Sequence, residues 1–365
     1  MMLRRRALQQ LSLIASCVLA GQPALAQAPS TGRKIAVLLP SASGEYRRAT
    51  NSIMAGLKAA QSRDGQGYTL DLFAVDERFD SLSNVYNEIA AKGYAFAIGP
   101  LTKTSVTQLG ELSNLSVPTL ALNWPDTDRI AAGNTVFFGL PIESESAYAA
   151  RAAFAEASTT SAKRPLRAST ICNTSPLGRR AAGAFAESWK EQGGVLSDQI
   201  ETDSRLAGEL KSLLGSADSE VYFVATGIET ARVIKNNVAK EALLYAPSML
   251  STGVTPNNVS QSLTRTPELD GYRVTDLPWL IQADNPAVMG YPRQTTLSHQ
   301  ELQRLYGLGI DAFRIAKELL AGNHSFELDG VSGRLKFDRN SDVRIQRTPA
   351  LAEYRGGVLF SLDKR

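Results

Sequence analysis

Small polar residues and glycines recur directly after the apolar segments of this chain, where they could bind a small anionic group. Hydroxyls and the backbone N–H groups at helix starts can hold a carboxylate. If the apolar segments are parallel strands, these residues gather at one edge of a sheet, where ligands of such folds bind. The candidate ligand-binding residues are Ser41, Ser43, Gly99, Thr102, Asn123, Trp124, Asn173, Thr226 and Ser251.

The same residues have a second interpretation that needs no ligand. Ser, Thr and Asn are the usual residues at a helix N-cap, and strand-to-helix junctions commonly carry one. Trp124, which lies between Asn123 and Pro125, could stack on a ligand or only close the mouth of a cleft. The chain offers four nearby acids for the ammonium group that an amino acid ligand carries: Glu45, Asp126, Glu229 and Asp276.

The motifs of several common enzyme classes are absent from the sequence. It contains no Walker A loop and no G-x-S-x-G elbow, and His299 and His324 lie far apart, so no metal site is predicted. An S-x-x-K at Ser361 to Lys364 has no K-T-G partner. Cys172 ends an apolar segment and is expected to be a buried core residue. We therefore predict a protein that is not an enzyme and that requires no cofactor.

The first 26 residues have the pattern of a signal peptide. A basic start at Met1 to Arg6 precedes an apolar stretch at Leu11 to Gly21, and residues 23–26 (PALA) end in a small-x-small cleavage pattern. An alternative is processing at I-A-S-C, residues 14–17, which would leave a lipid-anchored Cys17. Both interpretations predict export. No later segment reaches the roughly 18 apolar residues of a membrane span, so any membrane contact would come through the lipid.

The charge balance of the chain argues against a nucleic acid partner, and its cysteine content argues against a disulfide. The chain has 39 basic and 36 acidic residues, and residues 1–26 hold three arginines and no acid, so the remainder is formally neutral. Binding to nucleic acid phosphates requires a basic excess, so no nucleic acid partner is expected. After cleavage behind Ala26, Cys172 is the only cysteine, which excludes an intramolecular disulfide. The remaining length favours two lobes.

Strand-like and helix-like patterns alternate from Lys34 onward, which predicts parallel sheets covered by helices. In the first part, strands are expected at 35–40, 70–75, 94–98 and 117–122, with helices at 49–60, at 80–92 and from about Thr102. In the second part, helices are expected at 143–156, 176–191, 205–214 and 226–238, with strands at 166–172, 195–200, 221–225, 242–245 and 269–275.

The last part of the chain breaks this alternation. Residues 276–281 (DLPWLI) are expected to form an extended crossover, because Pro278 disfavours a helix. A long helix is predicted from Ser298 to Ala321, followed by a hairpin-like ending at 326–338 and 343–347. The predicted fold is an α/β fold of two doubly wound Rossmann-like lobes joined by crossover strands, with a C-terminal β-hairpin. One lobe comprises residues 33–140 and 282–325, and the other comprises residues 141–281 and 326–365.

Several sequence blocks in this order resemble type I periplasmic binding proteins and, more closely, the C-terminal domain of the LpoA family of penicillin-binding protein activators. The blocks are IAVLLP at 35–40, IGPL at 98–101, LALN at 120–123, FFGL at 137–140, SPLGRRAAGAFAESWKEQGG at 175–194, VYFVAT at 221–226, ELDGYRVTDLPWL at 268–280, RLYGLGIDAF at 304–313 and FELDGVSGRLKFDRN at 326–340. Because the predicted sheet starts at Lys34, we expect no counterpart of the helical-repeat N-terminal domain of the better-known members in this sequence.

The resemblance implies regulation rather than catalysis. Members of this family stimulate a class A penicillin-binding protein, the synthase that builds peptidoglycan, from the periplasmic side of the outer membrane. By this resemblance we expect a periplasmic regulator, soluble or tethered to the outer membrane through Cys17. The alternative is a solute-binding protein of an ABC transporter that holds an amino acid or another small polar ligand between its lobes.

Overall fold

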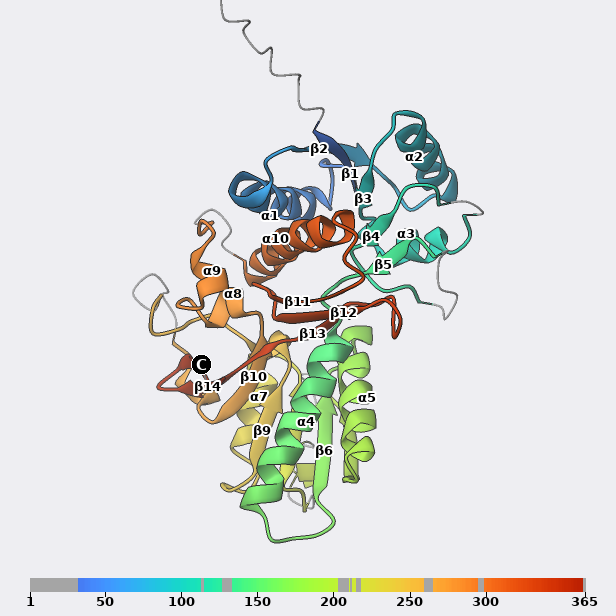
Figure 1. Cartoon of the computed structure of the whole chain (residues 1–365). Helices are drawn as coiled ribbons and strands as arrows, with labels where there is room; N and C mark the ends of the chain where they lie inside the picture. The colour runs from blue at the N-terminus through green and yellow to red at the C-terminus, as the bar shows by residue number, and fades with distance from the viewer. Residues whose placement is uncertain are drawn as a thin grey trace, which may run out of the picture. The chain divides into compact units, whose positions relative to one another are not determined.

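The computed structural model describes residues 32–112, 115–126, 133–202, 210, 212–214, 218–258, 265–294 and 299–363. The predicted signal peptide with Cys17, and most of the helix predicted at 205–214, lie outside these residues. The described residues form an α/β fold with two large sheets and one small sheet (Figure 1).

The first sheet has five parallel strands in the order β2-β1-β3-β4-β5. Strand β1 is apolar from residue 35 onward because helices cover both of its faces. Its odd-numbered residues pack with α1 and α10, and its even-numbered residues pack with α2 and α3. The elements are β1 (Arg33–Leu39), β2 (Tyr68–Ala74), β3 (Phe96–Ile98), β4 (Thr119–Ala121), β5 (Thr135–Phe137), α1 (Arg47–Asp64), α2 (Phe79–Ala91), α3 (Lys103–Leu109) and α10 (Gln300–Leu320).

The second sheet has seven strands in the order β15-β14-β10-β9-β8-β6-β7. Helices α4 and α5 lie side by side on one face, and α7 packs on the other (Figure 1). Strands β14 and β15 run antiparallel to the strands they pair with, β10 and β14. The elements are α4 (Ile142–Thr160), β6 (Arg167–Cys172), α5 (Pro176–Glu191), β7 (Val195–Glu201), β8 (Val221–Ala225), α7 (Ile228–Lys235), β9 (Leu243–Ala246), β10 (Tyr272–Asp276), β14 (Ala350–Arg355) and β15 (Val358–Ser361).

A small antiparallel sheet, in the order β11-β12-β13, follows α10 in the chain. Its inward residues Leu335 and Phe337 join the hydrophobic core that α1 and α10 form with the first sheet. Short helices connect the remaining segments. The elements are β11 (Ser325–Asp329), β12 (Arg334–Asp338), β13 (Gln346–Thr348), α8 (Pro278–Ile281), α9 (Pro286–Met289) and the 3₁₀ helices η2 (Ser248–Leu250) and η3 (Pro267–Leu269).

The predicted α/β class is confirmed, and two of its details need correction. Residues 278–281 form the helix α8 instead of an extended crossover. Pro278 occupies the first helical position, where its missing N–H has no intrahelical partner to lose. The chain also continues past the predicted hairpin into β14 and β15, which extend the second sheet. The assignment of residue ranges to the two lobes stays a prediction.

Two glycines allow α1 and α10 to cross closely. A Cβ atom added to Gly56 would collide with the backbone carbonyl of Tyr306, and one added to Gly309 would collide with that of Ile53. The backbones of the two helices are therefore in direct contact, and a side chain at either position would force them apart.

We expect Gly56→Ala to lower the free energy of unfolding by about 1–3 kcal/mol, because one helix backbone must move. Urea denaturation measures this change. Gly183→Ala in α5 is the matched control, since nothing lies within 4 Å of its added Cβ. Without a clash, the control should gain up to about 1 kcal/mol from helix propensity. Equal stability of the two variants would contradict the close crossing.

Candidate functional site

A cavity of about 510 Å³ lies where the carboxyl end of β4 approaches the starts of α4, α5 and α10. We call it the cleft. Its wall combines polar, charged and aromatic side chains, as a site for a small polar ligand would. The side chains that matter for its chemistry are Lys103, Asn123, Trp124, Arg180, Glu301 and Arg304.

Two of the three cations that line the cleft among the described residues form partly exposed ion pairs with nearby carboxylates. Lys103 Nζ lies 2.8 Å from Asp126 Oδ1, and Arg180 Nε lies 3.4 Å from Glu143 Oε1. Both pairs are partly exposed to solvent, so each interaction is weak. A ligand carboxylate would nevertheless have to compete with a carboxylate of the protein at both positions.

The third cation, Arg304 of α10, is held by Asp276 at the end of β10. Nε of Arg304 donates to Oδ1 at 2.9 Å, and Nη2 donates to Oδ2 at 2.8 Å. Asp276 is fully buried. Burial alone lowers the pKa of Arg304, but the Asp276 carboxylate outweighs it and raises that pKa above its ordinary value. This bidentate pair joins α10, which packs on the first sheet, to β10 of the second sheet.

A second buried ion pair lies beside the first. Nη2 of Arg347 in β13 donates to Glu145 Oε1 of α4 at 2.9 Å, and the side chains are 1% and 2% exposed. Ser248 links the two pairs, because its N–H donates to Glu145 Oε2 and its carbonyl accepts from Arg304 Nη2. We call these four charged side chains and Ser248 the ionic network.

Asn123 and Trp124 are the two sequence-predicted site residues that line the cleft. The amide of Asn123 donates to the Leu101 carbonyl at 3.1 Å and accepts from the Trp124 N–H at 2.9 Å. The Trp124 ring faces the Arg344 guanidinium, with 5.5 Å between the guanidinium carbon and the ring centroid. Asn123 therefore shapes the loop, and Trp124 already has a cationic neighbour.

Thr102 and Asn173 stabilise the starts of helices. Thr102 is the N-cap of α3 and accepts from the Ser105 N–H at 3.3 Å. Asn173 Oδ1 accepts from the N–H and the hydroxyl of Ser175, which is the N-cap of α5. These contacts match the interpretation without a ligand, in which such residues serve strand-to-helix junctions.

The other predicted residues are also accounted for by local structure. Ser41 and Ser43 are exposed and hydrogen-bonded to each other at 2.8 Å. Gly99 has φ of 111°, and a Cβ there would collide with the Leu38 carbonyl. Thr226 and Ser251 are buried, and neither lines the cleft. Contact of these residues with a ligand stays a prediction.

Three of the four acids proposed for a ligand ammonium group already have cationic partners. Asp126 pairs with Lys103, and Asp276 pairs with Arg304. Glu229 lies 2.5 Å from Arg232 within α7. Glu301, at the start of α10, lines the cleft and was not singled out from the sequence. The sequence feature that could have indicated Glu301 is an acidic residue in the first turn of a predicted long helix. The favourable interaction of such a residue with the helix dipole explains this feature without a ligand.

The part of the chain that the structure describes contains no group of three or more His, Cys, Asp or Glu residues placed to hold a metal ion. Over the same residues, no helix combines the length and apolar character needed to cross a membrane.

Comparison with known proteins identifies both a family and a fold. The family model described as "LppC putative lipoprotein" matches residues 19–221 and 195–357. A curated relative, the penicillin-binding protein activator LpoA of Enterobacter sp. (strain 638), is 27% identical over 335 residues, which are 79% of this chain and 44% of the relative. The chain spans about half the length of the curated relatives it matches.

Two solved structures share the architecture. One, from Chromobacterium violaceum, is described as a "putative branched-chain amino acid ABC transporter"; its TM-score is 0.70 at 27% identity, over 88% of this chain and 99% of that one. The other is the LpoA C-domain from Haemophilus influenzae, described as a regulator of PBP1A, with TM-score 0.71 at 19% identity over 90% and 100%. The predicted type I periplasmic binding protein fold is confirmed.

Breaking the Glu145–Arg347 pair should strongly destabilise the protein. We expect Arg347→Met to cost about 3–5 kcal/mol of unfolding free energy, because it leaves a buried carboxylate without its cation. Urea denaturation tests this. The double variant Glu145→Leu with Arg347→Met should lose less than Arg347→Met alone, since no buried charge remains.

Lys336→Met is the control for that measurement. It breaks the Lys336–Glu327 pair, in which both side chains are more than 60% exposed. We expect it to cost at most about 1 kcal/mol. A loss for Arg347→Met no larger than this control would contradict the importance of the buried pair.

Proposed function

The chain belongs to the LppC lipoprotein family, and we propose that it is a non-catalytic periplasmic regulator that activates a class A penicillin-binding protein by direct contact. The support comes from relatives named penicillin-binding protein activator, which match 79% to 85% of this chain. The LpoA C-domain from Haemophilus influenzae, described as a regulator of PBP1A, has the same fold. In this proposal the partner is the peptidoglycan synthase, and the regulator transfers no chemical group.

The observation that carries the proposal is that all three cations that line the cleft among the described residues are paired with carboxylates of the protein. An amino acid ligand presents a carboxylate, which is held by free donors or cations in a binding site. Here Arg304 is committed to a buried aspartate, and Lys103 and Arg180 face Asp126 and Glu143. Such a cleft fits a protein that acts through its outer surface.

The ionic network also favours a fixed arrangement of the cleft walls. Arg304 belongs to α10, which packs on the first sheet, whereas Asp276 ends a strand of the second sheet. Opening the cleft by separating these segments would break a desolvated charge pair, which is strongly unfavourable. A rigid scaffold presents a constant surface to a partner protein.

A solute-binding role is the second candidate function. It is favoured by the 27% identity to the Chromobacterium violaceum protein, which covers 99% of that chain and is described as a "putative branched-chain amino acid ABC transporter". In that role Glu301 would meet the ammonium group of the ligand, while Asn123 and Trp124 would contact its other groups.

We expect the purified protein to raise the rates of glycan polymerisation and peptide crosslinking by a class A penicillin-binding protein, measured with lipid-linked precursor. With an inactivated synthase the protein alone should give no product, because it is not a catalyst. In parallel, a panel of amino acids should leave its thermal unfolding midpoint unchanged. Unchanged synthase rates together with an amino-acid-induced rise in the midpoint would replace the activator proposal with the solute-binding one.

We further propose that Cys17 carries the lipid that holds the protein at the outer membrane. The support is the lipoprotein description of the family together with the I-A-S-C sequence at residues 14–17. Two acyl chains provide stable membrane anchoring, whereas one gives marginal binding.

Cys17→Ser should therefore move the protein from the membrane fraction to the soluble fraction, or leave it as an uncleaved precursor. Incorporation of labelled palmitate and mass spectrometry of the mature N-terminus measure the difference. Cys172→Ser is the matched control and should stay membrane-bound, because Cys172 is buried in the fold. A wild-type protein that begins at Gln27 without lipid would exclude the anchor.

A further inference from the structure

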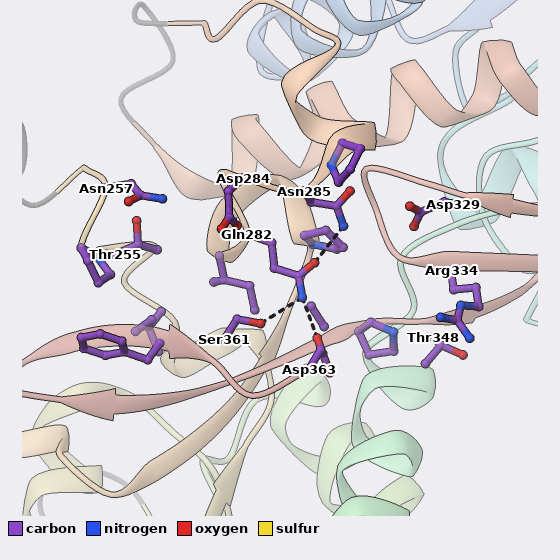
Figure 2. Close-up of a pocket in the computed structure, with 18 of the residues that line it drawn as sticks. Thr255, Asn257, Gln282, Asp284, Asn285, Asp329, Arg334, Thr348, Ser361 and Asp363 are labelled. Carbon is purple, nitrogen blue, oxygen red and sulfur yellow. Dashed lines mark hydrogen bonds between the residues drawn. The ribbon is translucent and has the colours of Figure 1, made fainter. Parts of the chain in front are cut away.

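A second cavity, of about 780 Å³, is separate from the cleft. We call it the polar pocket. It lies where the ends of β11, β12, β13 and β15 meet the segment that joins α8 to α9 (Figure 2). None of its lining residues also lines the cleft. The side chains used below are Gln282, Asp329, Arg334, Ser361 and Asp363.

Two neighbouring acid–base pairs on the β11–β12 ladder behave differently. Glu327 is opposite Lys336, and the two form an ion pair at 3.2 Å. Asp329 is opposite Arg334, yet among the described residues neither of these two side chains forms an ion pair. Both line one end of the polar pocket (Figure 2). The pocket therefore places a cation and an anion close together without an ion pair between them, and a further charge that acts on Arg334 is the Asp363 carboxyl.

The floor of the polar pocket is held in place by hydrogen bonds. The Gln282 amide donates to Asp363 Oδ2 at 2.7 Å and to Ser361 Oγ at 3.0 Å, as Figure 2 shows. Asp363 Oδ2 also accepts from the Leu351 N–H at 3.1 Å. Polar groups held in this way are positioned before a ligand arrives, which lowers the entropic cost of binding.

The far end of the polar pocket contains a buried hydroxyl without a partner. Thr255 lines the pocket and is 3% exposed, and its Oγ1 has no hydrogen-bond partner within the described ranges. Leaving a buried hydroxyl unsatisfied costs about 1–3 kcal/mol, so a group that bonds to it would be stabilising.

We propose that the polar pocket binds a short peptide that carries both a carboxylate and an ammonium group. Arg334 would pair with the carboxylate and Asp329 with the ammonium group, while Ser361 and Gln282 face the peptide amides. The volume lies in the range of roughly 300–1,000 Å³ that small-ligand sites occupy. Asp329 and Asp363 outnumber Arg334 among the charged side chains named above, which favours the ammonium end.

This contrasts with the cleft, where every cation that lines it is already paired. The proposal goes beyond the activator role and does not depend on it, because peptide binding can be measured without a synthase. A negative result here would leave the activation experiment unaffected.

The test is isothermal titration calorimetry of the mature protein with the peptide Ala-Glu-Lys-Ala. We expect saturable binding that weakens as salt is added, since exposed charges are screened. Acetylation of both amino groups, or amidation of both carboxylates, should each weaken binding. No saturable binding in the millimolar range would overturn the proposal.

Substitutions locate the site. Arg334→Gln and Asp329→Asn should each raise the Kd at least about threefold, the effect of losing one exposed charge pair. Lys336→Gln and Glu327→Gln, one pair further along the same strands, should leave the Kd unchanged. Thermal unfolding confirms that each variant is folded. Binding that is equally affected by the control variants, or insensitive to Arg334→Gln and Asp329→Asn, would place the peptide elsewhere and refute the assignment.

Discussion

Two buried ion pairs that meet at Ser248 hold together the segments that pass between the sheets. Removing a charge from water costs several kcal/mol, which the attraction of the opposite charge and further hydrogen bonds offset. Among the buried side-chain nitrogen and oxygen atoms of this network, only Nε of Arg347 lacks a hydrogen-bond partner within the described residues. Both carboxylate oxygens of Glu145 are used, by Arg347 and by the Ser248 N–H, and both oxygens of Asp276 accept from Arg304. The start of α4, the end of β10, the start of α10 and β13 are therefore held at one point, and the shape of the cleft follows from it.

The two cavities differ more clearly in the ion pairing of their lining side chains than in their volumes. In the cleft, each cation that lines the wall among the described residues forms an ion pair with a carboxylate of the protein. In the polar pocket, Arg334 and Asp329 are cross-strand neighbours without an ion pair among the described residues. The cations that line the cleft are thus paired within the protein, while Arg334 and Asp329 at the polar pocket form no ion pair among the described residues.

Local signals predicted some elements to the residue and failed at others. Helix α5 begins at Pro176 and ends at Glu191 as expected, because its cap, its N-terminal proline and its closing glycines are all local. Helix α8 was predicted wrongly as an extended segment, because a proline disfavours a helix interior. Pro278 instead occupies the first helical position, where a proline is compatible with a helix. Strands β14 and β15 escaped prediction, because β14 depends on pairing with β10, far away in sequence.

The sequence by itself determined the α/β class and most of the alternating helices and strands, because apolar periodicity and caps act over a few residues. The order of its sequence blocks gave the resemblance to the LpoA family. It also marked the strand-end residues, of which Asn123 and Trp124 reached the cleft. Only the tertiary structure decided which charges meet. Glu145 and Arg347 are 202 residues apart, whereas the adjacent strand partners Asp329 and Arg334 form no ion pair within the described part of the chain. Charge pairing depends on distances of a few ångströms between segments that folding brings together, and no local pattern encodes those distances.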